Sequence, residues 1–264
     1  MIAHALQRLS PPPFRHAIRT HSKRSLEAFL CMCGRGITTL HYEQPSLEPT
    51  LSPSFPQPFS VPEIEAHVVE VEVHGHRFTF EAGKLARLAD GAAVLKAGDT
   101  HVLATAVSSR HADVGRDFLP LQVEYRERSA AVGRIPTTFN KREGAPKDRE
   151  VLVARAVDRA VRPLFPAGYF YETQLLHNVM SVDPNRETDV LCINAASAAL
   201  TTSDIPWGGP VGAVRVAVIG GDCVLMPTID QQAEAEFNLL YASTADRAVM
   251  IEAEGGSGGG ISES

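Results

Sequence analysis

Three strand–turn–strand patterns constrain the fold of this chain more than any other feature. In each pattern, two strand-like stretches flank a short turn that contains glycine, which is typical of a β-hairpin. The hairpins are expected at 67–73 with 77–81, at 92–96 with 100–108, and at 211–219 with 223–226. Single strands are expected at 121–126, 175–182, 237–242 and 248–253.

Two helices are expected between these strands. The first covers 149–162, with Asp148 as its N-cap and Pro163 ending it. Its apolar stripe is formed by Val151, Ala154, Val157 and Val161. The second covers 190–201 and is rich in alanine, so it can pack closely on a sheet. Hairpins interleaved with two helices indicate an α+β fold with mixed sheets and packed helices.

The two ends of the chain differ from its middle. Residues 1–43 are rich in arginine and serine and poor in acids, which is typical of an organelle transit peptide. The alternative is a disordered basic tail of a cytosolic protein. Residues 44–63 form a Pro/Ser-rich stretch, expected to be a disordered linker. The folded domain is expected at 64–254, followed by a Gly/Ser tail at 255–264.

Charge and cysteine content exclude several classes of protein. The net charge of −6 argues against a protein coated in nucleic acid but permits a local basic groove. The four cysteines are too scattered for a disulfide scaffold, and Cys31 and Cys33 lack the second pair that a structural zinc ion requires. Without an apolar stretch of about 20 residues, no membrane span is expected. We therefore expect a soluble protein with reduced thiols and no membrane partner.

Positive charge is concentrated in one segment. Residues 121–162 contain ten lysines and arginines against six acids, and glycine and proline mark 133–144 as a loop. An exposed loop with cations and one aromatic ring, Phe139, is typical of a surface that binds a single nucleic-acid strand. The alternative is a solvated run of charges with Phe139 packed in the core.

Short motifs in a fixed order run through the folded region. They lie at 117–121, 125–128, 133–136, 142–144, 154–155, 162–166, 181–184, 195–200, 205–206, 209–212 and 227–228. Together they closely resemble the first core domain of the polynucleotide phosphorylase family, which are phosphorolytic 3′–5′ exoribonucleases. The resemblance covers about residues 64–254 and implies a ribonuclease PH-like core (ribosomal protein S5 domain 2-like).

The resemblance also implies partners and cofactors. Family members carry two such cores, form a homotrimeric ring around single-stranded RNA, and use phosphate as co-substrate with Mg²⁺. This chain carries only the first core, so the second core domain would be supplied in cis or in trans. The alternatives are a non-catalytic RNA-binding or assembly subunit, and a weakly active ribonuclease PH-like exonuclease. The leader favours a chloroplast, with a mitochondrion as the alternative.

Six residues are expected to contact RNA by this resemblance. The family has two aromatic residues and two arginines where this chain has Phe139-Asn140-Lys141-Arg142, so a milder clamp is expected here. The RNA-binding candidates are Phe139, Lys141, Arg142, Arg134, Arg126 and Arg128, and Tyr125 is expected on the same inner surface. Whether Arg155, Arg159 and Arg162 bind RNA or form structural ion pairs is left open.

The expected catalytic groups are incomplete. Where ribonuclease PH holds phosphate with a Thr-Arg pair, this chain has Thr188-Asp189, and Asp189 is better explained as a helix N-cap. Asp230 and Glu236 resemble the metal-binding carboxylates of ribonuclease PH and are the only weak catalytic and metal candidates; alternatively, they are exposed acids around a loop at 231–234. Surface or turn positions are expected for His74, His76, His101, His111 and His177.

Overall fold

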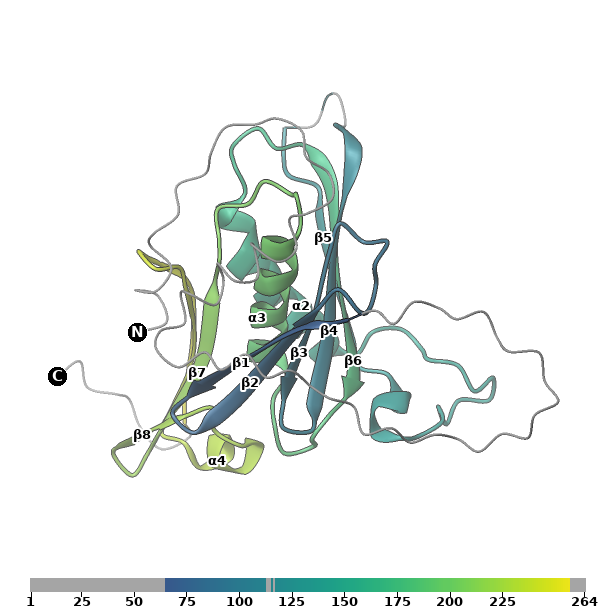
Figure 1. The fold of residues 1–264 in the computed structure, drawn as a ribbon. Coiled ribbons are helices and arrows are strands. Elements are labelled where there is room, and N and C mark those ends of the chain that lie inside the picture. Colours follow the sequence, from purple (N-terminus) through teal and green to yellow (C-terminus); the bar gives the residue numbers. More distant parts are fainter. Residues whose placement is uncertain (1–64, 113–114, 116, 257–264) are drawn as a thin grey trace.

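The computed structural model describes residues 65–112, 115 and 117–256 (Figure 1). The predicted leader, the linker and the Cys31–Cys33 pair lie outside the described residues, as does the tail from residue 257. Within the described part, the predicted α+β fold is confirmed: two sheets enclose two helices.

The larger sheet has six strands in the order β1-β2-β3-β4-β6-β5. The strands are β1 (His67–Val73), β2 (His76–Ala82), β3 (Gly91–Ala97), β4 (Thr100–Ala112), β5 (Leu121–Arg126) and β6 (Tyr171–Ser181). All neighbours are antiparallel except β5 and β6, which are parallel. The sheet is therefore mixed, and β5 forms one of its edges.

The smaller sheet has four antiparallel strands in the order β10-β9-β7-β8. The strands are β7 (Gly212–Ile219), β8 (Asp222–Leu225), β9 (Phe237–Ser243) and β10 (Ala248–Gly255), with the short helix α4 (Ile229–Glu234) between β8 and β9. All three hairpins expected from the sequence are confirmed.

Helices α2 (Asp148–Val161) and α3 (Asp189–Thr202) lie between the two sheets (Figure 1). The alanine-rich α3 contacts β3 and β4 on one side and β7 on the other, and nearly all of it is buried. Its approach to β3 is so close that a Cβ on Gly91 would lie 2.1 Å from the Ala199 carbonyl oxygen. Packing of small residues therefore joins the sheets into one core.

Helix α2 begins one residue earlier than expected. Asp148 is its first residue and Lys147 is the N-cap, so the prediction that Asp148 caps the helix is wrong. The apolar stripe is also partly wrong, because Val151 is 45% exposed and Ala154 is half-buried. The face that enters the core consists of Val153, Ala156, Val157, Ala160 and Val161. The helix ends before Pro163, as predicted, and a short 3-10 turn (Arg162–Leu164) follows.

Three further expectations are corrected. Asp189 is not the N-cap of α3 but its first residue, and Thr188 occupies the cap position. Residues 231–234 belong to α4, because Thr228 and Gln231 form a reciprocal capping box at its start. His177 is not at the surface but 1% exposed, since the period of two in β6 places it with Leu175 and Val179 on the core face.

Candidate nucleic-acid interface

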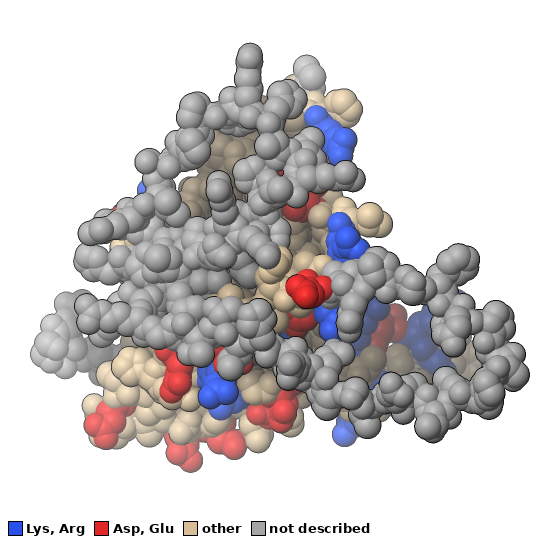
Figure 2. Space-filling view, viewed as in Figure 1, with Lys and Arg blue, Asp and Glu red and all other residues tan. Residues whose placement is uncertain are grey.

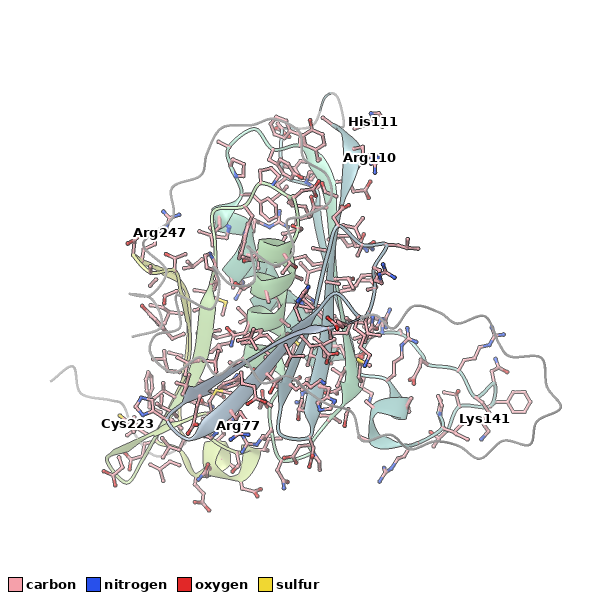
Figure 3. All side chains as sticks on the ribbon, viewed as in Figure 1. Arg77, Arg110, His111, Lys141, Cys223 and Arg247 are labelled. Atoms are coloured by element: carbon pink, nitrogen blue, oxygen red, sulfur yellow. The ribbon has the colours of Figure 1, made fainter. Side chains whose placement is uncertain are left out.

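Residues 128–147, here called the basic loop, connect β5 to α2. The loop projects away from the two sheets (Figure 1), and Figure 3 places Lys141 near its far end. A 3-10 turn (Ser129–Val132) lies at its start, and every residue from 137 to 149 is exposed. The predicted loop at 133–144 is thus confirmed, and its cations are accessible to solvent.

Phe139 is fully exposed, at 100% of its reference surface. The alternative in which this ring packs in the core is therefore wrong. Thr138 shapes this end of the loop: its hydroxyl donates to the Arg142 carbonyl oxygen (2.7 Å) and accepts from the Arg142 N–H (3.1 Å). This turn brings the backbone on the two sides of Phe139 together and leaves the ring in solvent, where a nucleic-acid base can stack on it.

The predicted RNA-binding cations are free of ion pairs within the described part of the chain. Arg128, Arg134, Lys141 and Arg142 are exposed, and Arg126 is half-buried at the end of β5. Figure 2 shows lysine and arginine side chains on the side of the basic loop, and mainly acidic side chains at the lower left, where Figure 1 places β8 and α4. On the face that Figure 2 shows, the two kinds of charge therefore gather in different places among the described residues.

A groove of about 320 Å³ lies between β5 and α2, beside the base of the basic loop. Arg126, Arg155 and Arg159 line it together with Glu124, Glu150 and Asp158. Arg155 and Arg159 are exposed and form no ion pair with a described residue. These two helix arginines are thus available to an anion at the groove.

Arg162, the third of these arginines, lies in the 3-10 turn after α2 and is structural. Its guanidinium pairs with Asp158 (2.7 Å) and donates to the carbonyl oxygens of Leu119 (3.0 Å) and Leu121 (3.2 Å). The hydrogen bond to Asp158 raises the pKa of Arg162 above its usual value. The sequence does not decide whether these three arginines bind RNA or form structural ion pairs. In the structure, Arg155 and Arg159 have no ion-pair partner among the described residues, whereas Arg162 connects α2 to β5.

Tyr125 is not an inner-surface residue, because its ring is only 2% exposed. Its hydroxyl lies 2.5 Å from the Thr188 hydroxyl and donates to the Glu127 carboxylate (3.0 Å). Burial raises the pKa of Tyr125, so the phenol stays protonated. Tyr125 thus joins β5 to the start of α3.

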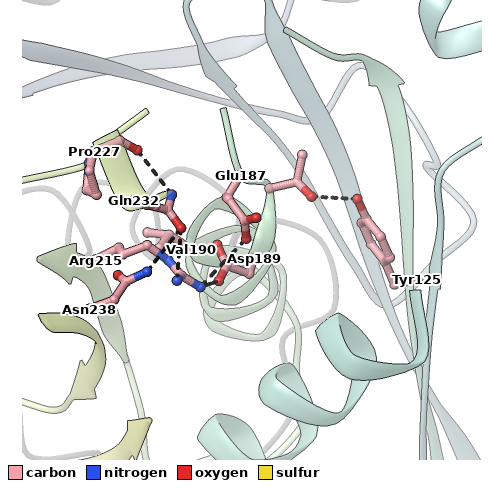
Figure 4. A network of polar contacts seen from close by, with 9 residues as sticks. Tyr125, Glu187, Asp189, Val190, Arg215, Pro227, Gln232 and Asn238 are labelled. Atoms are coloured by element: carbon pink, nitrogen blue, oxygen red, sulfur yellow. Dashed lines mark hydrogen bonds and ion pairs between the residues drawn. The ribbon is translucent and has the colours of Figure 1, made fainter. Parts of the chain in front are cut away.

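The start of α3 carries the Thr188-Asp189 pair, and Figure 4 shows Asp189 beside Arg215 and Glu187. Asp189 is 4% exposed; it accepts from the Val190 N–H (2.7 Å) and forms an ion pair with Arg215 of β7. The same guanidinium lies 3.7 Å from Glu187 and donates to Gln232 (3.2 Å). Burial and the neighbouring Asp189 raise the pKa of Glu187. A phosphate here would meet two carboxylates and an arginine already paired, so these residues do not fit a phosphate.

The metal candidates lie on either side of α4. Asp230 is exposed in the first turn of α4, and Glu236 is exposed just before β9. No group of three or more histidine, cysteine or acidic side chains that could hold a metal ion occurs among the described residues. The two acids do not form a complete Mg²⁺ site, so metal binding by this pair stays a prediction and no reaction step is assigned to it.

Sequence reasoning missed Arg215 and the buried state of His177. An arginine within the otherwise apolar strand 211–219 was a signal for a buried charge partner. For His177, burial lowers the pKa to about 4, and the ring Nδ1 lies 3.2 Å from the Glu124 carbonyl oxygen. Arg215 thus contacts the start of α3, and His177 contacts β5.

The two sheets that enclose α2 and α3 define a ribonuclease PH-like protein. The sequence profile of the 3′ exoribonuclease family, domain 1, matches residues 74–206, and that of domain 2 matches residues 209–264. The chain therefore belongs to the 3′ exoribonuclease family. In the part of the chain that the structure describes, no helix has the length and apolar character to cross a membrane.

Two curated relatives are plant proteins named polyribonucleotide nucleotidyltransferase 2, mitochondrial. The rice protein is 46% identical over 197 residues, which is 72% of this chain and 20% of the relative. The Arabidopsis thaliana protein is 42% identical over 233 residues, which is 88% of this chain and 23% of the relative. These relatives confirm the resemblance to polynucleotide phosphorylase. The chain spans about a fifth to a quarter of their length.

Solved structures confirm the fold alone. A chain of the Archaeoglobus fulgidus exosome with RNA bound to the active site has a TM-score of 0.56 at 17% identity, covering 70% of this chain and 79% of that chain. The crystal structure of rice Rrp46 has a TM-score of 0.53 at 20% identity, covering 67% of this chain and 80% of that chain. Both share the ribonuclease PH-like architecture seen here.

Proposed function

We propose that this chain is the RNA-binding first core of a phosphorolytic 3′–5′ exoribonuclease that degrades or processes RNA. The observation that carries the proposal is the fully exposed Phe139 beside Lys141 and Arg142 at the end of a projecting loop. A free ring stacks on any base, and free cations attract the phosphates of one strand. The relatives named polyribonucleotide nucleotidyltransferase support this reading.

The test is binding of a fluorescein-labelled 20-nucleotide oligoadenylate by the full chain, with a duplex of the same length as the competitor. The proposal expects tight, salt-dependent binding of the single strand and weaker binding of the duplex, whose bases are not available for stacking. Equal affinity for both, or none for the single strand, would contradict it.

Phosphorolysis itself is assigned to a second core, in cis or in trans. The paired Asp189 and Arg215 support this assignment, because the charge of this buried arginine at the start of α3 is already balanced by a carboxylate. Phosphate and Mg²⁺ would then act as co-substrate and cofactor in the second core. The pure chain with poly(A), phosphate and Mg²⁺ is expected to release no nucleoside diphosphate.

Two alternatives remain as outcomes of experiment. Release of ADP that is lost in Asp230→Ala would favour a weakly active ribonuclease PH-like exonuclease. A messenger RNA whose reading frame ends at Ser264 would favour a non-catalytic RNA-binding or assembly subunit. A homotrimer is proposed for the assembly, and light scattering of the purified chain measures it.

An organellar location is part of the proposal. The acid-poor leader supports it, as do the plant relatives named mitochondrial. The composition of the leader favours a chloroplast, with a mitochondrion as the alternative. Residues 1–43 fused to a fluorescent protein are expected to direct it to one of these organelles. A diffuse cytosolic signal would contradict the prediction that these residues are a transit peptide.

A further inference from the structure

One buried carboxylate holds both ends of the basic loop. Glu150 lies in the first turn of α2 and is 6% exposed. Its Oε1 accepts from the N–H of Glu127, directly after β5 (2.8 Å), and its Oε2 accepts from the N–H of Lys147, directly before α2 (2.7 Å). The two backbone positions that bound the loop are therefore tied to the same side chain.

The bond to Lys147 is what helix capping requires, because a glutamate at the third helical position commonly accepts from the N-cap amide. The bond to Glu127 is different, since it reaches a separate element and caps nothing. It fixes the backbone between Arg126 and Arg128, two of the predicted RNA-binding cations. Glu150 thereby sets where those arginines lie relative to the basic loop.

A second, outer contact narrows the loop. The N–H of Ser129 donates to Oε1 of Glu143 (2.9 Å), across the loop from one side to the other. Between these two positions, residues 137–142 are all exposed. The direction of the loop therefore depends on how its base is held, and the buried Glu150 is the part of that base that solvent does not reach.

We propose that Glu150 is a positioning residue for RNA binding: it holds the basic loop and the flanking arginines in one arrangement before the strand arrives. This inference rests on the proposed function. The two hydrogen bonds from Glu127 and Lys147 to Glu150 are here called the clasp. A loop that is ordered in advance loses less conformational entropy on binding, so the clasp raises affinity for RNA without touching it. Charge-assisted hydrogen bonds to two amides are strong enough to set this order.

The test is Glu150→Gln in the full chain. Glutamine keeps the size of the side chain, but its NH₂ group cannot accept a hydrogen bond, so one amide loses its partner. Amide hydrogen exchange without RNA is expected to rise in residues 128–147 and to stay unchanged in β4 and β6. Affinity for the labelled oligoadenylate is expected to fall about tenfold. The slope of affinity against salt is expected to stay the same, because no cation is removed.

Val157→Ala is the matched control for a loss of stability. Val157 is fully buried on the same helix but lies away from the clasp, so its truncation lowers the melting temperature through packing alone. It is expected to leave both loop exchange and RNA affinity at the wild-type level. An equal loss of affinity in both variants would reduce Glu150 to a purely structural residue and overturn the proposal.

Glu143→Ala covers the case in which Glu150→Gln does not fold, because this position is exposed and its change leaves the core intact. Alanine has no acceptor for the Ser129 N–H, so the outer contact opens and faster exchange in residues 129–143 is expected. Unchanged exchange in the folded variants would overturn the clasp even if the wild-type chain binds no RNA. Absence of RNA binding by the wild type would instead contradict the proposed function.

Discussion

Asp189 and Arg215 form a buried ion pair that joins the first residue of α3 to the middle of β7. The pair lies where the resemblance to ribonuclease PH puts a phosphate-holding arginine. Here the arginine comes from another element, and its charge is balanced by a carboxylate of the chain itself (Figure 4). The ion pair therefore connects α3 to the smaller sheet at this position.

Arg215→Met is expected to destabilise the fold by about 3–5 kcal/mol, because it leaves Asp189 buried without its cation. Urea unfolding followed by circular dichroism measures the loss. The double variant Arg215→Met/Asp189→Asn removes the stranded charge as well and is expected to recover much of the stability. A double variant as unstable as the sum of the two single variants would show that the pair is not coupled.

His177 is expected to make stability depend on pH in the acid range. Burial lowers its folded pKa to about 4, whereas the unfolded ring protonates near pH 6.5. The stability that depends on the neutral ring is therefore complete above about pH 6.5 and falls as the pH drops towards 4, by about 3 kcal/mol in total. Below pH 4 this contribution no longer changes.

Urea unfolding of the wild type and of His177→Gln at several pH values between 7.5 and 4 measures this effect. The raised pKa of Glu187 acts in the opposite direction, because its folded form binds a proton more readily. Both chains carry Glu187, so the difference between them isolates His177. Parallel curves for the two chains would show that the ring does not titrate as described.

Arg162→Ala and Arg155→Ala are expected to differ, although Arg155 lies on α2 and Arg162 follows directly after it. Loss of Arg162 removes the bonds to Asp158 and to two carbonyl oxygens, at a cost of about 1–3 kcal/mol. Loss of the exposed Arg155 is expected to change stability by no more than about 0.5 kcal/mol. Thermal unfolding of both variants tests the division, and equal effects would contradict it.

Asn140→Phe is expected to strengthen RNA binding, because it restores the second aromatic residue of the family motif beside Phe139. One stacked base contributes about 1–3 kcal/mol, and Phe139→Ala is expected to lose a similar amount. Asn140→Leu adds apolar surface without a ring and serves as the control. Equal gains from phenylalanine and leucine would indicate a hydrophobic contact in place of stacking.

The parts of the fold that depend on neighbouring residues were predictable from the sequence. The three hairpins follow from local alternation and their glycine turns, and the basic loop follows from its composition. Parallel pairing of β5 with β6 was not predictable, because it joins strands separated by α2 and carries no local signature. Likewise, Asp189 is an acceptable N-cap by its sequence, and only the distant Arg215 makes it a buried ion-pair partner.

The candidate site divides in the same way. The identity of Phe139, Lys141 and Arg142 as exposed loop residues follows from nearby glycine and proline. The buried positions of Tyr125 and Glu150 could not be predicted from residue type alone. Tyr125 contacts Thr188 and Glu150 contacts Glu127, and both contacts join residues far apart in the sequence. For His177 a signal did exist, since it alternates with Leu175 and Val179 on the inward face of β6.

The salt dependence of RNA binding in Lys141→Ala/Arg142→Ala tests the central claim, that the basic loop grips a single strand, most directly. Each phosphate contact contributes about 0.7 to the slope of log affinity against log salt concentration, so the slope is expected to decrease by about 1.4. Arg77→Ala/Arg247→Ala removes the same charge at exposed positions that Figure 3 places far from Lys141, and is expected to keep the wild-type slope. An unchanged slope in Lys141→Ala/Arg142→Ala would contradict the account.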